Sequence, residues 1–211
     1  MSTYEGYLAS TASPTFVTIL AAAATFRGEA GDRPRASEVV SALLQAEKLA
    51  KQQRLTYPLE SLLGRWRLCF VVTTQKARTR SGIVLGRGWY VPKIARAHIS
   101  FSAQALTSGQ SPGKREIENQ LQFGSLLLKL TGPFQYLDKK NLLAFDFTKM
   151  QICLFSHAVY SRDVRGGKTQ AQDFYSQSIA KLPFFAFFLI TEEFIAARGR
   201  GGGLALWIKE T

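Results

Sequence analysis

Two glycine-containing motifs far apart in the chain constrain its fold more than any other feature. Gly64-x-Trp66 opens a run of alternating residues, and Arg198-Gly199-x-Gly201-Gly202 precedes the last apolar run. In a small antiparallel barrel, such a glycine permits an unusual backbone at the start of the first strand, and the tryptophan fills the floor. An arginine from the last strands can stack its planar guanidinium on the indole. The motifs therefore predict a closed barrel in which Trp66 and Arg198 meet at the floor.

The hydrophobic period from Arg65 onward is two, as in a strand with one buried face. The residues predicted to share that face are Trp66, Leu68, Phe70 and Val72. Similar runs occur at 98–103, 126–130, 143–147 and 204–208, and turns rich in glycine, proline or polar residues separate them. Many short strands without a βαβ rhythm indicate a barrel or a sandwich. We therefore predict a mainly β fold, an antiparallel β-barrel with N-terminal helices.

Two helices are expected before the barrel. The apolar run at 14–26 is well short of the roughly 20 residues that a membrane-spanning helix requires. Ser37 can cap a second helix over 37–54, which has one apolar face and is expected to close one end of the barrel. The predicted organisation is an N-terminal extension with a short helix at 1–36 and a barrel domain at 37–211. Residues 169–181 are compatible with either a short helix or a long loop.

The net charge of +12 is distributed unevenly. No acidic residue occurs between Glu60 and Glu116, whereas many basic residues fall there, which predicts a positive face. Such a field attracts nucleic acid, an anionic membrane or an acidic protein surface. The sequence has no nucleic-acid-binding motif, so we expect one of the other two partners. The predicted basic face comprises Lys76, Arg78, Arg80, Arg87, Lys93 and Arg96.

The segments around both motifs resemble a known family. Leu68 to Thr74 continues the first motif, residues 191–209 surround the second, and Lys139 to Thr148 forms a third matching segment. Together they resemble the plastid lipid-associated proteins, or plant-type fibrillins, over roughly residues 37–211. Ala197 and Arg200 depart from the family pattern, which leaves the ligand open. The positions that match are Gly64, Trp66, Arg198, Gly199, Gly201 and Gly202.

The resemblance implies a lipocalin-like (calycin) barrel that carries or stores lipophilic molecules at thylakoids or plastoglobules. The N-terminal residues do not have the Arg-rich, acid-poor composition of a plastid transit peptide. We therefore expect a cyanobacterial member at the thylakoid membrane periphery, on the cytoplasmic side. The plastid equivalent would lie on the stromal side or in plastoglobules.

The sequence predicts no enzymatic activity, no cofactor and no metal site. His98 and His157 lie in no recognisable catalytic motif, and His98 is expected on the polar side of its strand, at the surface or at a pocket rim. Cys69 and Cys153 lie in apolar runs with nothing at metal-ligand spacing. We therefore expect both thiols to be reduced core residues rather than a disulfide.

A barrel of about eight strands can hold one small ligand when its lining side chains are not too bulky. The predicted lining of Leu, Val, Phe and Ala suits a quinone, a carotenoid or a fatty acyl chain, and the alternative is a barrel filled by its own phenylalanines. Residues 182–190 are apolar on both faces, so this strand is either covered twice or inserted into lipid. The expected lipid or partner contacts at the barrel mouth are Phe184, Phe185, Phe187 and Phe188.

Three functions remain open from the sequence. The first is a non-enzymatic, thylakoid-associated lipid-binding protein. The second is a scaffold or assembly factor that docks a photosynthetic or isoprenoid-biosynthetic complex through the basic face. The third is a bilin lyase-type calycin, which would need charged groups inside its pocket, where Arg198 is the plausible inward charge.

Overall fold

A computed structural model describes residues 13–76, 83–103, 115–164 and 171–210 of the chain. The helical elements are α2 (Pro14–Arg27), α3 (Ala36–Gln53), η1 (Leu59–Leu62), η2 (Asp138–Lys140), α4 (Ala171–Ser176) and η4 (Ile179–Lys181). The strands are β1 (Gly64–Lys76), β2 (Ile83–Tyr90), β3 (Ala95–Ala103), β4 (Arg115–Phe123), β5 (Leu126–Leu137), β6 (Leu142–Phe145), β7 (Lys149–Leu154), β8 (His157–Asp163), β9 (Phe184–Ile190), β10 (Phe194–Gly199) and β11 (Leu204–Lys209).

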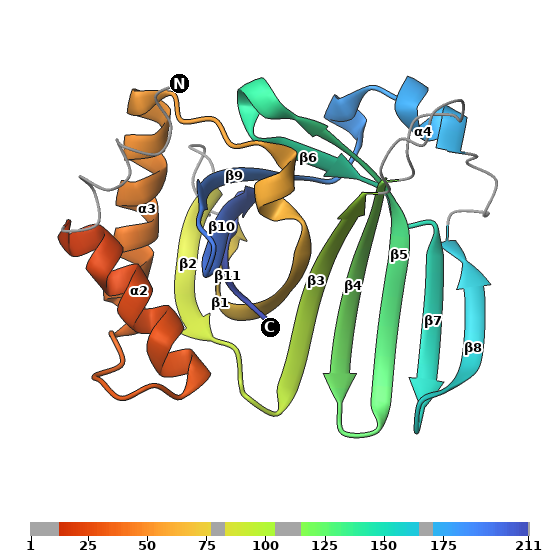
Figure 1. Ribbon diagram of the computed structural model, residues 1–211, viewed down its shortest axis with the longest axis horizontal. Helices are drawn as coiled ribbons and strands as arrows, with labels where there is room; N and C mark the ends of the chain where they lie inside the picture. Colours follow the sequence, from red (N-terminus) through yellow and green to blue (C-terminus); the bar gives the residue numbers. More distant parts are fainter. Residues whose placement is uncertain (1–12, 77–82, 104–114, 165–170, 211) are drawn as a thin grey trace.

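Eight strands form a closed antiparallel barrel in the order β4-β3-β1-β11-β10-β9-β6-β5, and pairing of β5 with β4 closes it (Figure 1). The last strand, β11, pairs with the first strand, β1, with Trp66 opposite Lys209. The predicted lipocalin-like antiparallel barrel with N-terminal helices is confirmed.

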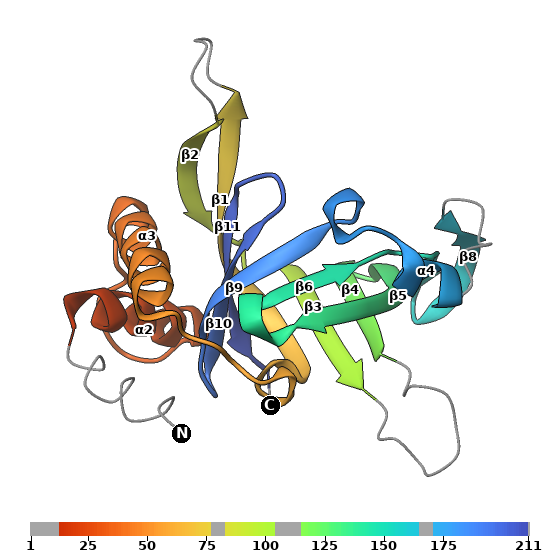
Figure 2. The ribbon, with the colours of Figure 1, turned by 90° about the horizontal axis from the view of Figure 1, so that it is seen from above.

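Two long strands continue beyond the barrel because each changes its partner half-way. The first residues of β1 pair with β3 and the later ones with β2. The first residues of β5 pair with β7 and the later ones with β6. Figure 2 shows that the β1–β2 hairpin and the β7–β8 hairpin project from the barrel in different directions. We call β4, residues 126–131 of β5, β7 and β8 the open sheet.

Helices α2 and α3 cover the outer face of the barrel on the side of β1, β9, β10 and β11 (Figure 1). The Ser13 hydroxyl accepts a hydrogen bond from the Phe16 amide at 3.2 Å, and Pro14 begins α2. Serine is favoured at the N-cap of a helix and proline at its first position. Helix α3 begins at Ala36, and its N-cap is Arg35, with the Glu38 carboxylate accepting from the Arg35 amide at 2.8 Å. The expectation that Ser37 caps this helix and that the helix closes a barrel end is therefore wrong.

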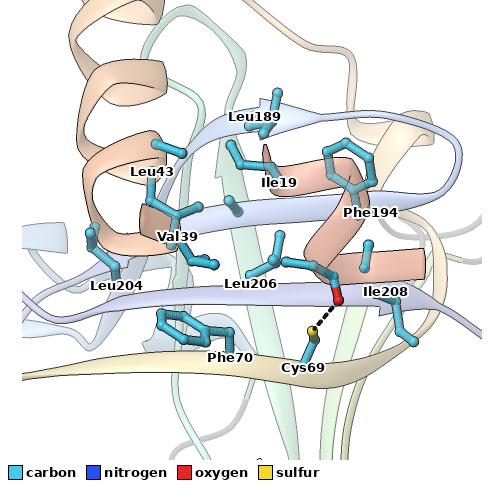
Figure 3. Close-up of a cluster of buried hydrophobic side chains, with 14 of the residues drawn as sticks. Ile19, Val39, Leu43, Cys69, Phe70, Leu189, Phe194, Leu204, Leu206 and Ile208 are labelled. Carbon is cyan, nitrogen blue, oxygen red and sulfur yellow. Dashed lines mark hydrogen bonds between the residues drawn. The ribbon is translucent and has the colours of Figure 1, made fainter. Parts of the chain in front are cut away.

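Figure 3 shows the apolar layer between these helices and the strands, where Val39 and Leu43 of α3 pack on Leu204 and Leu206. The register of β1 against β11 shifts between Leu68 and Phe70, which marks a β-bulge. Because of the bulge, Trp66 faces the barrel interior, whereas Phe70 and Val72 face the helices. The prediction that these residues share one face with Leu68 is wrong from the bulge onward.

The barrel interior is filled by its own aromatic side chains. The rings of Phe134 and Phe187 each lie 6.0 Å from that of Phe101 in edge-to-face contacts, and all three residues are buried. Trp66 and Trp207 belong to the same cluster. The middle of the barrel therefore matches the alternative of a core filled by phenylalanines.

Three further sequence expectations can be compared with the structure. Residues 171–176 of the undecided segment form α4, and residues 179–181 form a 3-10 turn. Cys69 and Cys153 are both free, as predicted, but only Cys69 is a core residue, buried under α2, whereas Cys153 is half-buried. Among the helices of the described residues, none is long and apolar enough to span a bilayer.

Candidate functional site

One end of the barrel is closed by residues 55–63, which we call the strap. Leu59 and Leu62 of the strap pack into the barrel interior, and the fully buried Trp66 donates from Nε1 to the Leu62 carbonyl at 2.7 Å. Gly64 precedes this tryptophan with a φ of 118°, which disfavours any side chain. The Gly64-x-Trp66 motif therefore forms the closed end.

The cation on the Trp66 indole is Lys209, not Arg198. Lys209 Nζ lies 4.2 Å from the ring centroid and donates to the Leu63 carbonyl at 2.7 Å. Burial lowers the pKa of this ammonium group. Arg198 lies opposite Leu204, which pairs with Val72, six residues beyond Trp66 along β1 and so roughly 20 Å away. The predicted stacking of Arg198 on Trp66 is wrong.

Arg198 instead fixes α3 to the barrel. Its Nε donates to Glu47 Oε1 at 2.8 Å, and its Nη atoms contact Glu47 Oε2 and the Gly202 carbonyl. Burial raises the pKa of Glu47, but hydrogen bonds from Arg198 and Lys51 more than offset this, and the pKa lies below its usual value. Gly202 adopts a φ of 86° in the hairpin turn between β10 and β11, one of the glycine-rich turns expected between the apolar runs.

Asn141 ties the strap to the barrel, a role that the sequence did not suggest. Its Oδ1 accepts from the Tyr57 amide at 2.9 Å, and its Nδ2 donates to the Leu55 carbonyl at 2.6 Å. The Tyr136 hydroxyl donates to the Tyr57 carbonyl at 3.1 Å. The turn at 138–141 was recognised from its polar residues, but its partner lies more than 80 positions earlier in the chain.

The other end of the barrel, to which β1 and β4 run, is less completely buried. Half-buried apolar side chains lie on the interior side of the barrel at this end. Among them, Phe185 contacts Trp207, with ring centroids 5.5 Å apart. We call this end the mouth. Its half-buried residues are Leu68, Phe147, Phe185 and Ala205.

An apolar surface continues from the mouth onto the open sheet. Because side chains alternate along a strand, the even-numbered residues of β5 lie on the same face as Phe134 and Tyr136, which enter the barrel core. The odd-numbered residues of β4 likewise share the face of the buried Ile117. Pairing of β5 with β7 extends this face. We call it the apolar inner face, formed by Leu121, Phe123, Leu126, Leu128, Leu130, Met150, Ile152 and Leu154.

The four expected phenylalanine contacts of β9 lie within the protein. Phe187 is buried in the barrel interior, whereas Phe188 is buried beneath the helices. Phe184 packs with Phe174 and Leu182 on the outer side. Phe185 is half-buried and stacks on Phe145 at 5.1 Å, which leaves it as the member of the set at the mouth. The strand is thus covered on both faces, which is one of the two alternatives that the sequence left open.

The structure describes only part of the predicted basic face. Arg87, Lys93 and Arg96 are exposed. Arg78 and Arg80 lie outside the described residues, as does the side chain of Lys76. Lys93 and Arg96 sit next to the turn between β2 and β3, close to the open sheet.

His98 is 3% exposed, and the expectation of a surface or pocket-rim position is wrong. Its Nε2 lies 3.0 Å from a Glu210 carboxylate oxygen and its Nδ1 lies 3.3 Å from Arg65 Nη2. Burial lowers the pKa of the imidazole, and the carboxylate of Glu210 opposes this. His157 is exposed at the start of β8. In the part of the chain that the structure describes, no group of His, Cys, Asp and Glu side chains is arranged to hold a metal ion.

Two hollows lie outside the barrel. A cavity of about 30 Å³ between α2, α3 and β9 has room for a single water molecule. A shallow groove of about 510 Å³ between α2 and α3 has a mixed lining that includes Glu38, Ser41 and Gln45. Neither is an enclosed apolar site of the size that a lipophile needs.

No protein-family model, no curated protein and no solved structure matched this chain. Membership of the plastid lipid-associated family therefore stays a prediction from the sequence motifs.

Proposed function

We propose that this protein is a non-enzymatic lipid-binding protein that holds a small lipophile, such as a quinone, a carotenoid or a fatty acyl chain. The observation that supports this proposal is the apolar inner face, which continues along β5 from the barrel core to the open sheet. Leu121, Phe123, Leu126 and Leu154 of this face are exposed. Contiguous exposed apolar surface of this kind marks binding sites in soluble proteins.

The ligand is expected at the mouth and on the open sheet rather than deep in the barrel. The core between Phe101, Phe134 and Phe187 is already filled by their rings. Along β5, the face extends from Leu126 to Phe134, eight residues or roughly 26 Å. This exceeds the roughly 15 Å that one leaflet of a bilayer core provides, so an extended lipid tail fits along it. Covering the face would contribute about 25 cal/mol per Å² of apolar surface.

Location at the thylakoid membrane periphery belongs to the same proposal. It is supported by the resemblance to plastid lipid-associated proteins and by the net charge of +12. An acidic protein partner in place of a lipid, as in the scaffold function, would use the exposed Arg87, Lys93 and Arg96. The two functions differ in one property, because a lipid carrier retains a lipophile after purification and a scaffold does not.

Mass spectrometry of organic extracts from the purified protein tests this property directly. Titration with a fluorescent fatty acid or quinone analogue should then give saturable uptake. Leu128→Gln, on the inner face, should weaken uptake strongly, whereas the neighbouring Leu127→Gln, on the opposite face of β5, is the matched control. An empty extract together with no saturable uptake of either probe would rule out the lipid-binding function.

A further inference from the structure

Three turns, of which the second and third are hairpin turns, meet along one edge of the protein, at the bottom of Figure 1. They join β2 to β3, β4 to β5 and β7 to β8. Strand pairing places Ala95 opposite Phe123, Phe123 opposite Leu126, and Leu126 opposite Leu154. The Phe155 amide also donates to the Ser125 carbonyl at 3.1 Å, which joins the second turn to the third. The three turns therefore form one continuous edge.

This edge carries large apolar side chains in contact with water. The exposed fractions are 67% for Ile94, 59% for Phe123, 48% for Leu126, 40% for Leu154 and 73% for Phe155. We call these five residues the hairpin-tip surface. Single exposed apolar residues are common on soluble proteins, whereas five on adjacent turns form a patch that calls for a partner.

Phe155 shows that this surface is not a by-product of folding. It has a φ of 47°, and Ser156 after it has a φ of 68°, the backbone of a two-residue hairpin turn that favours Asn or Gly. A bulky residue is strained in this region of backbone space. Because the Phe155 side chain is also highly exposed, neither turn geometry nor packing accounts for a phenylalanine here. An unfavourable residue kept at a loop tip points to a function of its side chain.

The charges around the hairpin-tip surface are positive. No acidic residue occurs in 91–97, 120–127 or 150–160, and Lys93 and Arg96 are exposed beside Ile94. Lys129, three residues from Leu126, is paired with Glu118 and adds no net charge, so Lys93 and Arg96 are the cations beside the tips. Apolar tips with cations a short distance behind them match the order of layers in an anionic bilayer, in which hydrocarbon lies below charged headgroups.

We propose that the hairpin-tip surface docks the protein on an anionic lipid bilayer, with the side chains of the tips in the interface and Lys93 and Arg96 at the phosphates. Five side chains on narrow turns fall short of the about 800 Å² per partner of a standard protein interface, which favours a bilayer over a protein. In this orientation the apolar inner face begins at the membrane surface. The docking deepens the proposed lipid-binding function by naming its membrane contact, but it does not require that function.

Sedimentation of the full chain with phosphatidylcholine vesicles, with and without phosphatidylglycerol, tests the docking. Wild type should bind the anionic vesicles, and Phe155→Asn and Phe123→Ser should each weaken partition by about tenfold, the effect of withdrawing one large apolar side chain. Val17→Ser, at an exposed apolar residue of α2, is the control for lost apolar surface. Lys93→Glu with Arg96→Glu should reduce binding further, while Lys48→Glu on α3 should not.

The choice of Phe155→Asn separates docking from misfolding, because Asn suits the turn and the thermal midpoint should equal or exceed that of wild type. Unchanged sedimentation of this variant, or equal loss in Val17→Ser, would overturn the proposal. So would a wild-type protein that ignores vesicles but forms dimers in light scattering that the tip variants abolish. Probe uptake without sedimentation refutes the docking alone, whereas sedimentation without uptake refutes the lipid-binding function alone.

Discussion

The helix-covered side of the barrel and the open sheet are both built from antiparallel strands but differ in what covers them. In β9, the consecutive residues Phe187 and Phe188 point to opposite faces, and both are buried, one in the barrel and one under the helices. In β5, the consecutive residues Leu127 and Leu128 are both half-buried. In β8, every residue is exposed. Burial on the two sides therefore depends on the second layer rather than on the strand sequence alone.

This difference predicts a division of roles. Substitutions on the helix-covered side should lower the free energy of unfolding, because they remove contacts in a densely packed core. Substitutions on the open sheet should change binding with little effect on stability.

Trp66→Ala should lower the free energy of unfolding by about 3–5 kcal/mol, because it leaves a cavity in the closed end of the barrel. Chemical denaturation with tryptophan fluorescence or circular dichroism measures this loss. Trp89→Ala, at a tryptophan that is 45% exposed on β2, is the matched control and should cost clearly less, about 1 kcal/mol. Equal costs at the two positions would contradict the closed-end assignment.

Arg198→Met and Glu47→Gln should each cost about 1–3 kcal/mol, because each leaves a partly buried charge without its partner. A double-mutant cycle should show that the two changes are not additive. Lys51→Met removes the more exposed partner of the same carboxylate and should cost less than about 1 kcal/mol. Additive effects of the first two variants would show that the ion pair does not hold α3.

Acidification should lower the free energy of unfolding of the protein through His98. Burial lowers the pKa of its imidazole in the folded state, so the unfolded state binds the proton more tightly. The contribution of His98 is therefore complete above the ordinary pKa of about 6.5 and is lost as the pH falls through the lowered value. Unfolding midpoints measured from about pH 7 to about pH 5 should decline, and His98→Gln should flatten that decline. An identical pH profile in the variant would exclude this origin.

Phe155→Asn should have the smallest effect on stability and the opposite sign. Relief of the left-handed backbone at this turn should raise the free energy of unfolding by up to about 1 kcal/mol. Thermal denaturation at high and low salt measures it. A clear loss of stability instead would mean that the Phe155 side chain packs in the folded protein. Substitutions on the open sheet would then also affect stability, against the proposed division of roles.

The sequence was sufficient for the barrel because its evidence is local. Alternating residues such as Ile99 and Phe101 mark strands, and the glycines near 202 mark the hairpin between β10 and β11. A bulge at Cys69 was hidden, because one extra residue moves Phe70 to the other face without any change in composition. The face that a side chain takes after a bulge is set by the register with the neighbouring strand. The pattern of residues within one strand does not contain that register.

The candidate site was harder to predict than the fold. Arginine was expected on Trp66 because of the motif, but the strand register brings Lys209 there and places Arg198 beside Glu47. The apolar inner face was missed because Leu126 to Leu130 had been assigned to an ordinary strand of the barrel. Only the change of partner within β5, from β7 to β6, shows that the first half of this strand also joins the barrel to the β7–β8 hairpin.

Pairing of β1 with β11 has a consequence for the order in which the chain can fold. Trp66 and Cys69 belong to the first strand, yet Trp66 pairs with the last strand, and α2 and α3 pack on β9, β10 and β11. During synthesis the N-terminal helices and β1 emerge long before those partners. Contacts of such large sequence separation are associated with slow folding, in milliseconds to seconds. The helices and β1 can meet one another, β2 and β3 early, but their apolar faces lack the cover of β9, β10 and β11 until the C-terminal hairpin has left the ribosome, and apolar surface exposed in that interval favours aggregation.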